Sequence, residues 1–273
     1  MHLMASINRY FFRVNKNYYV LAENSREDVK MSVALNYQLS VFGKFTIAPL
    51  PDVITALMNK INAETQETFL PNIINSQQIE IPSNRIITTA NLGFVTQNQQ
   101  YSIAILNNRI DVNYNKTVDS DVDIETFYAF SAKALVAIMD YFGIVSNRLA
   151  VNIQQVCEFD SFEKMHLCGK KLVTSAAYYD DKEFSEWSMR TNSQVDIELD
   201  ERQEVLNVIT DISSGQDING QKAACLFHID INTAHQNQSM RFKKDSLPPF
   251  VHNEKNIGIK HIEDVETLFI QYK

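Results

Sequence analysis

The 273-residue sequence is poor in glycine and cysteine, and each shortage excludes a class of protein. Only seven residues are glycine, against roughly 7 % in an average protein, and they are not clustered as in phosphate-binding loops. Rossmann and P-loop enzymes are therefore not expected. The three cysteines, Cys157, Cys168 and Cys225, are an odd number without regular spacing, so the sequence predicts no disulfide framework.

Long apolar runs are also missing. The longest runs from Ala134 to Met139, far short of the ~20 residues that a membrane helix needs. The first residues lack the charged, apolar and small-residue order of a signal peptide. We therefore expect a cytoplasmic protein with no membrane contact.

Charge is present but unevenly distributed. The net charge of −8 divides into +2 over residues 1–116 and −10 over residues 117–273. The densest basic stretch is Arg241-Phe-Lys-Lys244. Because DNA-binding proteins draw their affinity from many Lys and Arg contacts to phosphate, we expect no nucleic-acid partner.

The first half reads as strand, helix, three strands and helix. Residues 29–47 are strand-like, and an apolar face from Val53 to Ile61 predicts a helix that begins at Pro51. Three segments rich in β-branched and aromatic residues, of which the last two alternate, then predict an antiparallel meander: Ile86–Gln97, Tyr101–Leu106 and Arg109–Asn113. The pair Asn107-Asn108 suits a type I′ turn between the last two strands. An apolar stripe from Ile124 to Phe142 predicts the second helix, and Gly143 is its expected end.

The second half repeats this order of elements. A strand over Arg148–Val156 precedes a short helix over Ser161–Leu172, and an apolar stripe from Ile259 to Tyr272 predicts a final helix. Three strand candidates lie between the helices: Trp187–Leu199, Gln203–Ile212 and Ala223–Ile231. We therefore predict an α+β fold of antiparallel meander sheets packed on helices, with an internal duplication into halves 1–145 and 146–273. The residues of the halves do not align, so a chance similarity within one continuous domain is the alternative.

The acidic cluster before the second helix is the strongest metal candidate. Asp119, Asp121, Asp123 and Glu125 alternate as oxygen ligands do in calcium loops. However, the turn glycine is missing and Phe130 occupies the twelfth position, where a bidentate glutamate belongs. Carboxylates at a helix start also cap free N–H groups, so we interpret the cluster as a cap and expect no metal. A second acidic run from Asp196 to Glu201 alternates with apolar residues and predicts the wet face of a strand.

The sequence contains few patterns that would indicate a catalytic site. His166-Leu-Cys168 lacks the close-spaced pairs of a zinc site. A triad of Cys225, His228 and Asp230 fails because residues three apart on a strand face opposite sides. Hydrolase, metalloprotease and kinase motifs are absent from the sequence. We therefore expect no catalytic residue and no cofactor.

Aromatic residues offer another route to function. Tyr10, Phe11, Phe12, Arg13, Tyr18 and Tyr19 are of the types enriched at interface hot spots, although they are also ordinary strand residues. A long polar connection, residues 233–256, contains Pro248, Pro249 and Phe250 and is either a surface loop or an arm that reaches a partner. We name these nine residues as partner-binding candidates.

Several short motifs carry a resemblance to a family. They are Gly93-Phe94-Val95, Tyr101–Leu106, Arg109-Ile-Asp-Val-Asn113, Phe127–Phe142, Arg148-Leu149 with Ile153, His228-Ile-Asp230 and Ile262–Phe269. Over roughly residues 86–273 the chain resembles a sporadically distributed family of uncharacterised bacterial proteins of about this length. It departs from the family pattern at Asn152-Ile153-Gln154, where a Tyr-Ile-Asn element is expected. The resemblance implies no established activity, and the patchy distribution of the family is similar to that of mobile-element or phage-conflict genes.

Together these observations favour a non-enzymatic binding protein that recognises a protein partner, in a bacterial defence or mobile-element operon. A metal-dependent hydrolase or nuclease that uses the acids of residues 119–125 is one alternative. An acidic antitoxin or immunity-type protein is the other. Exposed sheet edges invite pairing, so a homodimer is also compatible with the sequence.

Overall fold

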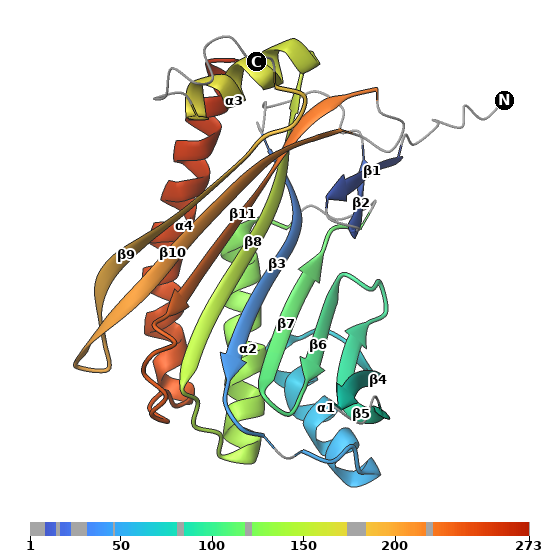
Figure 1. Ribbon diagram of the computed structural model, residues 1–273. Helices are drawn as coiled ribbons and strands as arrows, with labels where there is room; N and C mark the ends of the chain where they lie inside the picture. The colour runs from blue at the N-terminus through green and yellow to red at the C-terminus, as the bar shows by residue number, and fades with distance from the viewer. Residues whose placement is uncertain are drawn as a thin grey trace, which may run out of the picture.

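The computed structural model describes residues 9–14, 17–22, 32–45, 47–80, 85–117, 122–173, 184–216 and 221–272. In these ranges nine strands form one antiparallel sheet in the order β4-β5-β6-β7-β3-β8-β11-β10-β9, and β1 and β2 form a separate hairpin (Figure 1). The strands are β1 (Arg9–Val14), β2 (Asn17–Ala22), β3 (Val33–Phe42), β4 (Phe69–Glu80), β5 (Arg85–Thr96), β6 (Tyr101–Ile105), β7 (Arg109–Asn115), β8 (Arg148–Phe159), β9 (Ser188–Leu199), β10 (Arg202–Gln216) and β11 (Ala223–Thr233). The helices are α1 (Pro51–Thr65), α2 (Ile124–Phe142), α3 (Phe162–Val173), α4 (Leu247–Ile270) and the short 3-10 helix η2 (Lys244–Ser246).

The α+β class, with an antiparallel sheet packed on helices, is confirmed. After the hairpin, the chain runs through β3, α1, β4 to β7 and α2, and then through β8, α3, β9 to β11 and α4. The first strands of the two series, β3 and β8, pair antiparallel at the centre of the sheet. The series differ by one strand, β4, which the sequence pattern missed because Pro71 and the adjacent pair Ile73-Ile74 interrupt its alternation.

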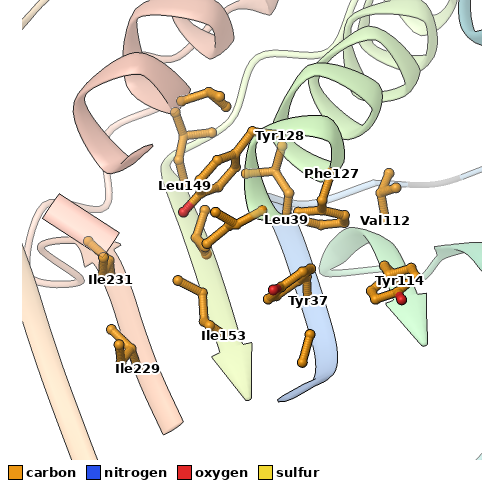
Figure 2. Close-up of a cluster of buried hydrophobic side chains, with 14 of the residues drawn as sticks. Tyr37, Leu39, Val112, Tyr114, Phe127, Tyr128, Leu149, Ile153, Ile229 and Ile231 are labelled. Atoms are coloured by element: carbon orange, nitrogen blue, oxygen red, sulfur yellow. The ribbon is translucent and has the colours of Figure 1, made fainter. Parts of the chain in front are cut away.

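One face of the sheet and the inner sides of the four α-helices enclose the main core. Figure 2 shows Tyr37 and Tyr114 on neighbouring strands, close to Phe127 of α2. The Tyr37 ring centroid lies 5.5 Å from that of Tyr114 and 5.4 Å from that of Phe127. All four helices contribute buried residues to this cluster, so they cover the same face of the sheet.

Helix α2 begins and ends as the sequence predicted. The Asp123 side chain accepts a hydrogen bond from the Thr126 N–H at 2.7 Å, which satisfies one of the free donors of the first turn. Gly143 ends the helix with φ of 62°, a left-handed conformation that glycine adopts without steric cost.

The predicted type I′ turn at Asn107-Asn108 is wrong. Neither residue has positive φ. Their carbonyls instead accept hydrogen bonds from the backbone N–H groups of Phe45 and Gly43, so the segment after β3 shapes this turn. The left-handed pair lies at Asp200-Glu201, with φ of 53° and 60°, in the two-residue link between β9 and β10.

The expectation of a long loop over residues 233–256 is also wrong. Helix α4 begins at Leu247, directly after η2, so the segment between β11 and the helices is short. The side chains of Phe242, Leu247 and Phe250 are fully buried. The proline pair did not break the helix because proline is tolerated in a first turn, where N–H groups have no intrahelical partner.

Gly169 on α3 provides a test of packing against the single tryptophan. A Cβ atom at Gly169 would lie 2.3 Å from ring atoms of Trp187. We expect Gly169→Ala to lower the free energy of unfolding by about 1–3 kcal/mol despite the better helix propensity of alanine, because overpacking forces the ring to move. Urea unfolding monitored by circular dichroism measures this, with Lys171→Ala at an exposed position of the same helix as control. A more stable Gly169→Ala variant would contradict the prediction.

Candidate functional site

The face of the sheet that is turned away from the helices carries the polar residues. Strand β3 shows the alternation: Tyr37, Leu39 and Val41 belong to the helix-covered core, whereas Gln38 and Ser40 lie on the opposite side. In Figure 1 this open face is turned toward the viewer, in front of α2 and α4.

The strand register aligns amide side chains from distant parts of the chain on this open face. Asn152 of β8 lies between Gln38 of β3 and Asp230 of β11, and Gln38 in turn lies opposite Asn113 of β7. The row therefore crosses four adjacent strands that come from both halves of the sequence. Directly opposed side chains on one sheet face have Cβ atoms about 4.5–5.5 Å apart, and at this spacing the amide groups of Asn and Gln side chains can reach each other to form hydrogen bonds.

Hydrogen bonds connect the amides of this row with each other and with His228 of β11. His228 Nε2 lies 2.8 Å from Asn152 Oδ1, and Asn152 Nδ2 donates to Gln38 Oε1 at 3.5 Å. Gln38 Nε2 then donates to Asn113 Oδ1 at 2.8 Å. The side chains are half-buried, so each retains hydrogen-bonding groups that reach solvent.

A second amide row crosses the strands toward the β9 edge. Gln194 Nε2 donates to Asn207 Oδ1 at 3.2 Å, and Asn207 Nδ2 donates to Asn232 Oδ1 at 3.3 Å. Asn232 then donates to Asp230 at 3.0 Å, which joins the second row to the first. We call the combined set the amide face: Gln38, Asn113, Asn152, Gln194, Asn207, His228, Asp230 and Asn232.

Ion pairs flank the amide face on both sides. Arg190 of β9 lies 3.0 Å from Asp211 of β10, and Arg109 lies 2.9 Å from Asp111 on β7. Burial raises the pKa of Asp111, while a hydrogen bond from Ser40 and the charge of Arg109 oppose that rise. The charges on this surface are therefore largely paired within the sheet.

The surroundings of His228 favour the neutral form of its imidazole over the charged form. Burial lowers its pKa, and the positive charge of Arg190 acts in the same direction, whereas Asp230 and Asp211 raise it. In the neutral ring Nε2–H donates to Asn152, which fixes the orientation of both side chains. Cys225 lies on the other side of β11, in the helix-covered core, so Cys225 and His228 face opposite sides of the strand, as the alternation predicted.

One end of the open face is apolar. Leu35, Val156, Ala224 and Leu226 form a small buried cluster there, separate from the main core. Strand β1 contacts β10 and β2 contacts β3, so the hairpin lies at the same end of the sheet. Leu35 is set apart by an irregularity in the β3–β8 register between Ala34 and Asn36.

The acidic candidates do not converge in the described part of the chain. Asp119 and Asp121 lie outside the described residues. Asp123 caps α2, and Glu125 Oε1 forms an ion pair with Lys255 Nζ of α4 at 2.7 Å. Within the described ranges, no three His, Cys, Asp or Glu side chains are grouped so that they could hold a metal ion. The run at Asp196 and Glu198 is exposed while Ile197 and Leu199 are buried, which confirms the strand interpretation.

The partner-binding candidates have different positions. Tyr10, Phe11, Phe12 and Arg13 lie on β1, and Tyr18 and Tyr19 on β2, where the structure describes the backbone only. Pro248 and Pro249 are exposed in the first turn of α4. Phe250 is fully buried, so its side chain belongs to the core. Contact with a partner remains a prediction for the other eight candidates.

The three cysteines gather inside the fold although their spacing is irregular. Cys157 and Cys225 lie directly opposite each other on β8 and β11. Burial raises the pKa of Cys225, and the neighbouring Cys168 and Cys157 raise it further. All three lie in the helix-covered core, and the raised pKa of the Cys225 thiol makes it unreactive.

Comparison with known proteins adds no relative. The chain matches no known family model, and no curated protein is similar enough to count as a match. The resemblance to a sporadic bacterial family therefore stays a prediction. Of the helices that the structure describes, none combines the length and apolar character that would span a bilayer.

Sequence reasoning missed the amide face as a site. It identified the strands, but Asn152, Gln38 and Asn113 are ordinary solvent-side residues when each strand is read separately. Asn152 between Val151 and Ile153 was a visible sign of polar alternation. The alignment of amides across the sheet depends on the pairing of strands from distant parts of the chain, as for Gln38 and Asn152, which are 114 residues apart.

Proposed function

We propose that this protein is a non-enzymatic binding protein and that its partner is a polypeptide segment that contacts the amide face. The observation that supports this proposal is the hydrogen-bonded array of amides on the helix-free side of the sheet. Gln38, Asn113 and Asn152 are half-buried and Gln194 is exposed, and each of these amides carries donors and an acceptor, which match the N–H and C=O groups of a peptide backbone. The β-sheet holds the array rigidly, so little side-chain entropy is lost on binding.

The charge of the amide face supports a polypeptide over a nucleic acid. Asp211 and Asp111 are paired with Arg190 and Arg109, and Asp230 adds a further negative charge. Phosphate backbones are attracted by an excess of Lys and Arg, which the described part of this face does not have. Neutral hydrogen-bonding groups and basic side chains of a polypeptide are compatible with it.

A peptide-selection experiment tests this proposal with the full chain. A displayed library of random peptides is selected on the immobilised protein, and the most enriched peptide is labelled for fluorescence anisotropy. We expect Asn152→Ala to weaken binding of that peptide by about 10-fold, because it removes the amide that links His228 to Gln38 and a truncation of this kind costs about 1–2 kcal/mol.

The matched control is Lys133→Ala, an exposed position on α2 on the helix side of the molecule, which should leave the affinity unchanged. Circular dichroism verifies that both variants are folded. Failure of any peptide to be enriched, or equal affinity for Asn152→Ala and the unsubstituted chain, would refute the proposed function.

A further inference from the structure

Strand β9 is an end strand of the sheet, so one of its edges is paired with none of the strands that the structure describes. Within the described ranges β9 pairs only with β10, and Figure 1 shows it at the margin of the sheet opposite β4. An end strand presents a row of N–H and C=O groups that a further strand can pair with. The other end strand, β4, carries an exposed Pro71, which has no N–H to donate.

The usual protections of an edge strand are missing from the middle of β9. Its pairing with β10 is continuous from Ser188 to Leu199, without a bulge. Residues 191–195, Thr-Asn-Ser-Gln-Val, contain no charge and no proline, and residues 191–194 are exposed. Natural sheets normally place lysine, proline or a bulge at such an edge to prevent pairing.

The residues of β9 on the two sides of Ser193 are complementary in charge and in apolar character. When the strand is paired antiparallel with a copy of itself and centred on Ser193, Arg190 lies opposite Asp196 and Met189 lies opposite Ile197. We propose that β9 of one chain pairs in this register with β9 of a second copy, so that two nine-stranded sheets join into one across a two-fold axis. Antiparallel pairing about a two-fold axis is the closed, self-complementary arrangement of most homodimers.

Each face of the joined sheet is compatible with this register. Arg190 lies opposite Asp211 on β10 and Asp196 lies opposite Val205, so both belong to the open face. The Arg190 guanidinium uses Nη1 for Asp211 and retains further N–H donors for Asp196 of the second copy. Met189 and Ile197 pack against the helix-covered core, and their pairing extends that core across the axis. The inference is independent of the proposed partner, because the helices of both copies stay on one side and both amide faces stay open.

Sedimentation velocity of the full chain over a series of concentrations is the first test, and we expect a monomer–dimer equilibrium. Arg190→Glu places like charges opposite each other twice per dimer, and Asp196→Arg does the same with the opposite sign. Each should weaken the dimer at least ~10-fold, since directly opposed like charges destabilise strand pairing. The double variant Arg190→Glu/Asp196→Arg restores opposite charges and should recover most of the dimer. A monomer at every concentration, or a double variant no better than the single ones, would overturn the proposal.

A cross-linking experiment tests the register. Because the native cysteines are buried, a thiol introduced on β9 is the accessible one. Under mild oxidation Ser193→Cys should form a disulfide-linked dimer, since the two introduced thiols meet at the axis. The control Thr191→Cys should not, because its two copies lie about 13 Å apart, four residues at about 3.3 Å each. Equal cross-linking of both variants, or of Thr191→Cys only, would contradict the register.

Discussion

Arg241→Met is expected to lower the free energy of unfolding by about 3–5 kcal/mol, because it removes one partner of a buried ion pair. Arg241 is 5 % exposed and holds Glu204, 7 % exposed, through two parallel hydrogen bonds of 2.7 Å and 3.0 Å. Its guanidinium also stacks 4.2 Å from the Phe242 ring centroid. Removal of the cation leaves the Glu204 carboxylate buried without a partner.

The Arg241 side chain also fixes the segment that leads from β11 toward α4. Arg241 donates to the carbonyls of Asn147, Asn237 and Ser239, so one side chain ties the segment after β11 to the start of β8. Urea unfolding monitored by circular dichroism measures the loss. The double variant Glu204→Met/Arg241→Met leaves no unpaired charge and should recover a large part of it. A single variant as stable as the unsubstituted chain would contradict the assignment.

Glu254→Gln should stabilise the protein, and the gain should grow with pH. Glu254 lies on α4, is fully buried, and neither carboxylate oxygen has a hydrogen-bond partner in the described part of the chain. The Tyr128 hydroxyl, which Figure 2 shows extending from α2 toward the sheet, is likewise unpartnered. Burial raises the pKa of Glu254 well above its usual value, and the charge of Asp230 on β11 adds to this effect.

The sign follows from proton linkage. Below the pKa of the unfolded chain Glu254 is protonated in both states and has no pH-dependent effect. Above it, the unfolded chain loses the proton while the folded chain keeps it, so stability falls by about 1.4 kcal/mol per pH unit until the raised pKa of the folded state is reached. Glutamine cannot ionise, so the variant lacks this decline.

Chemical unfolding at a series of pH values from acid to mildly alkaline measures the difference between the two proteins. The curves should nearly coincide at acid pH, where both side chains are neutral, and separate as the pH rises. Glu263→Gln, at an exposed position of the same helix, is the matched control and should leave the pH dependence unchanged. Parallel curves for Glu254→Gln and the unsubstituted chain would show that Glu254 is not buried in its neutral form.

The same helix illustrates what patterning could and could not predict. The apolar stripe from Ile259 to Tyr272 located the end of α4, but the segment before it was expected to be a loop because Pro248 and Pro249 interrupt the stripe. Packing of Leu247 and Phe250 into the core outweighs the local preference. Likewise, the polar pair at Asn107-Asn108 suggested a type I′ turn, but hydrogen bonds from Gly43 and Phe45 determined its shape.

Local sequence by itself determined most of the elements, since periods of 2 and 3.6 residues show which side of a strand or helix is buried wherever the chain passes. It determined the α2 cap at Asp123, its end at Gly143, and the opposite orientations of Cys225 and His228. Only the tertiary structure decided that Gln38, Asn113 and Asn152 form one row, that three irregularly spaced cysteines meet, and that Glu254 is buried beside Tyr128. The physical reason is that strand register and helix docking depend on contacts between residues far apart in the chain, which no local pattern specifies.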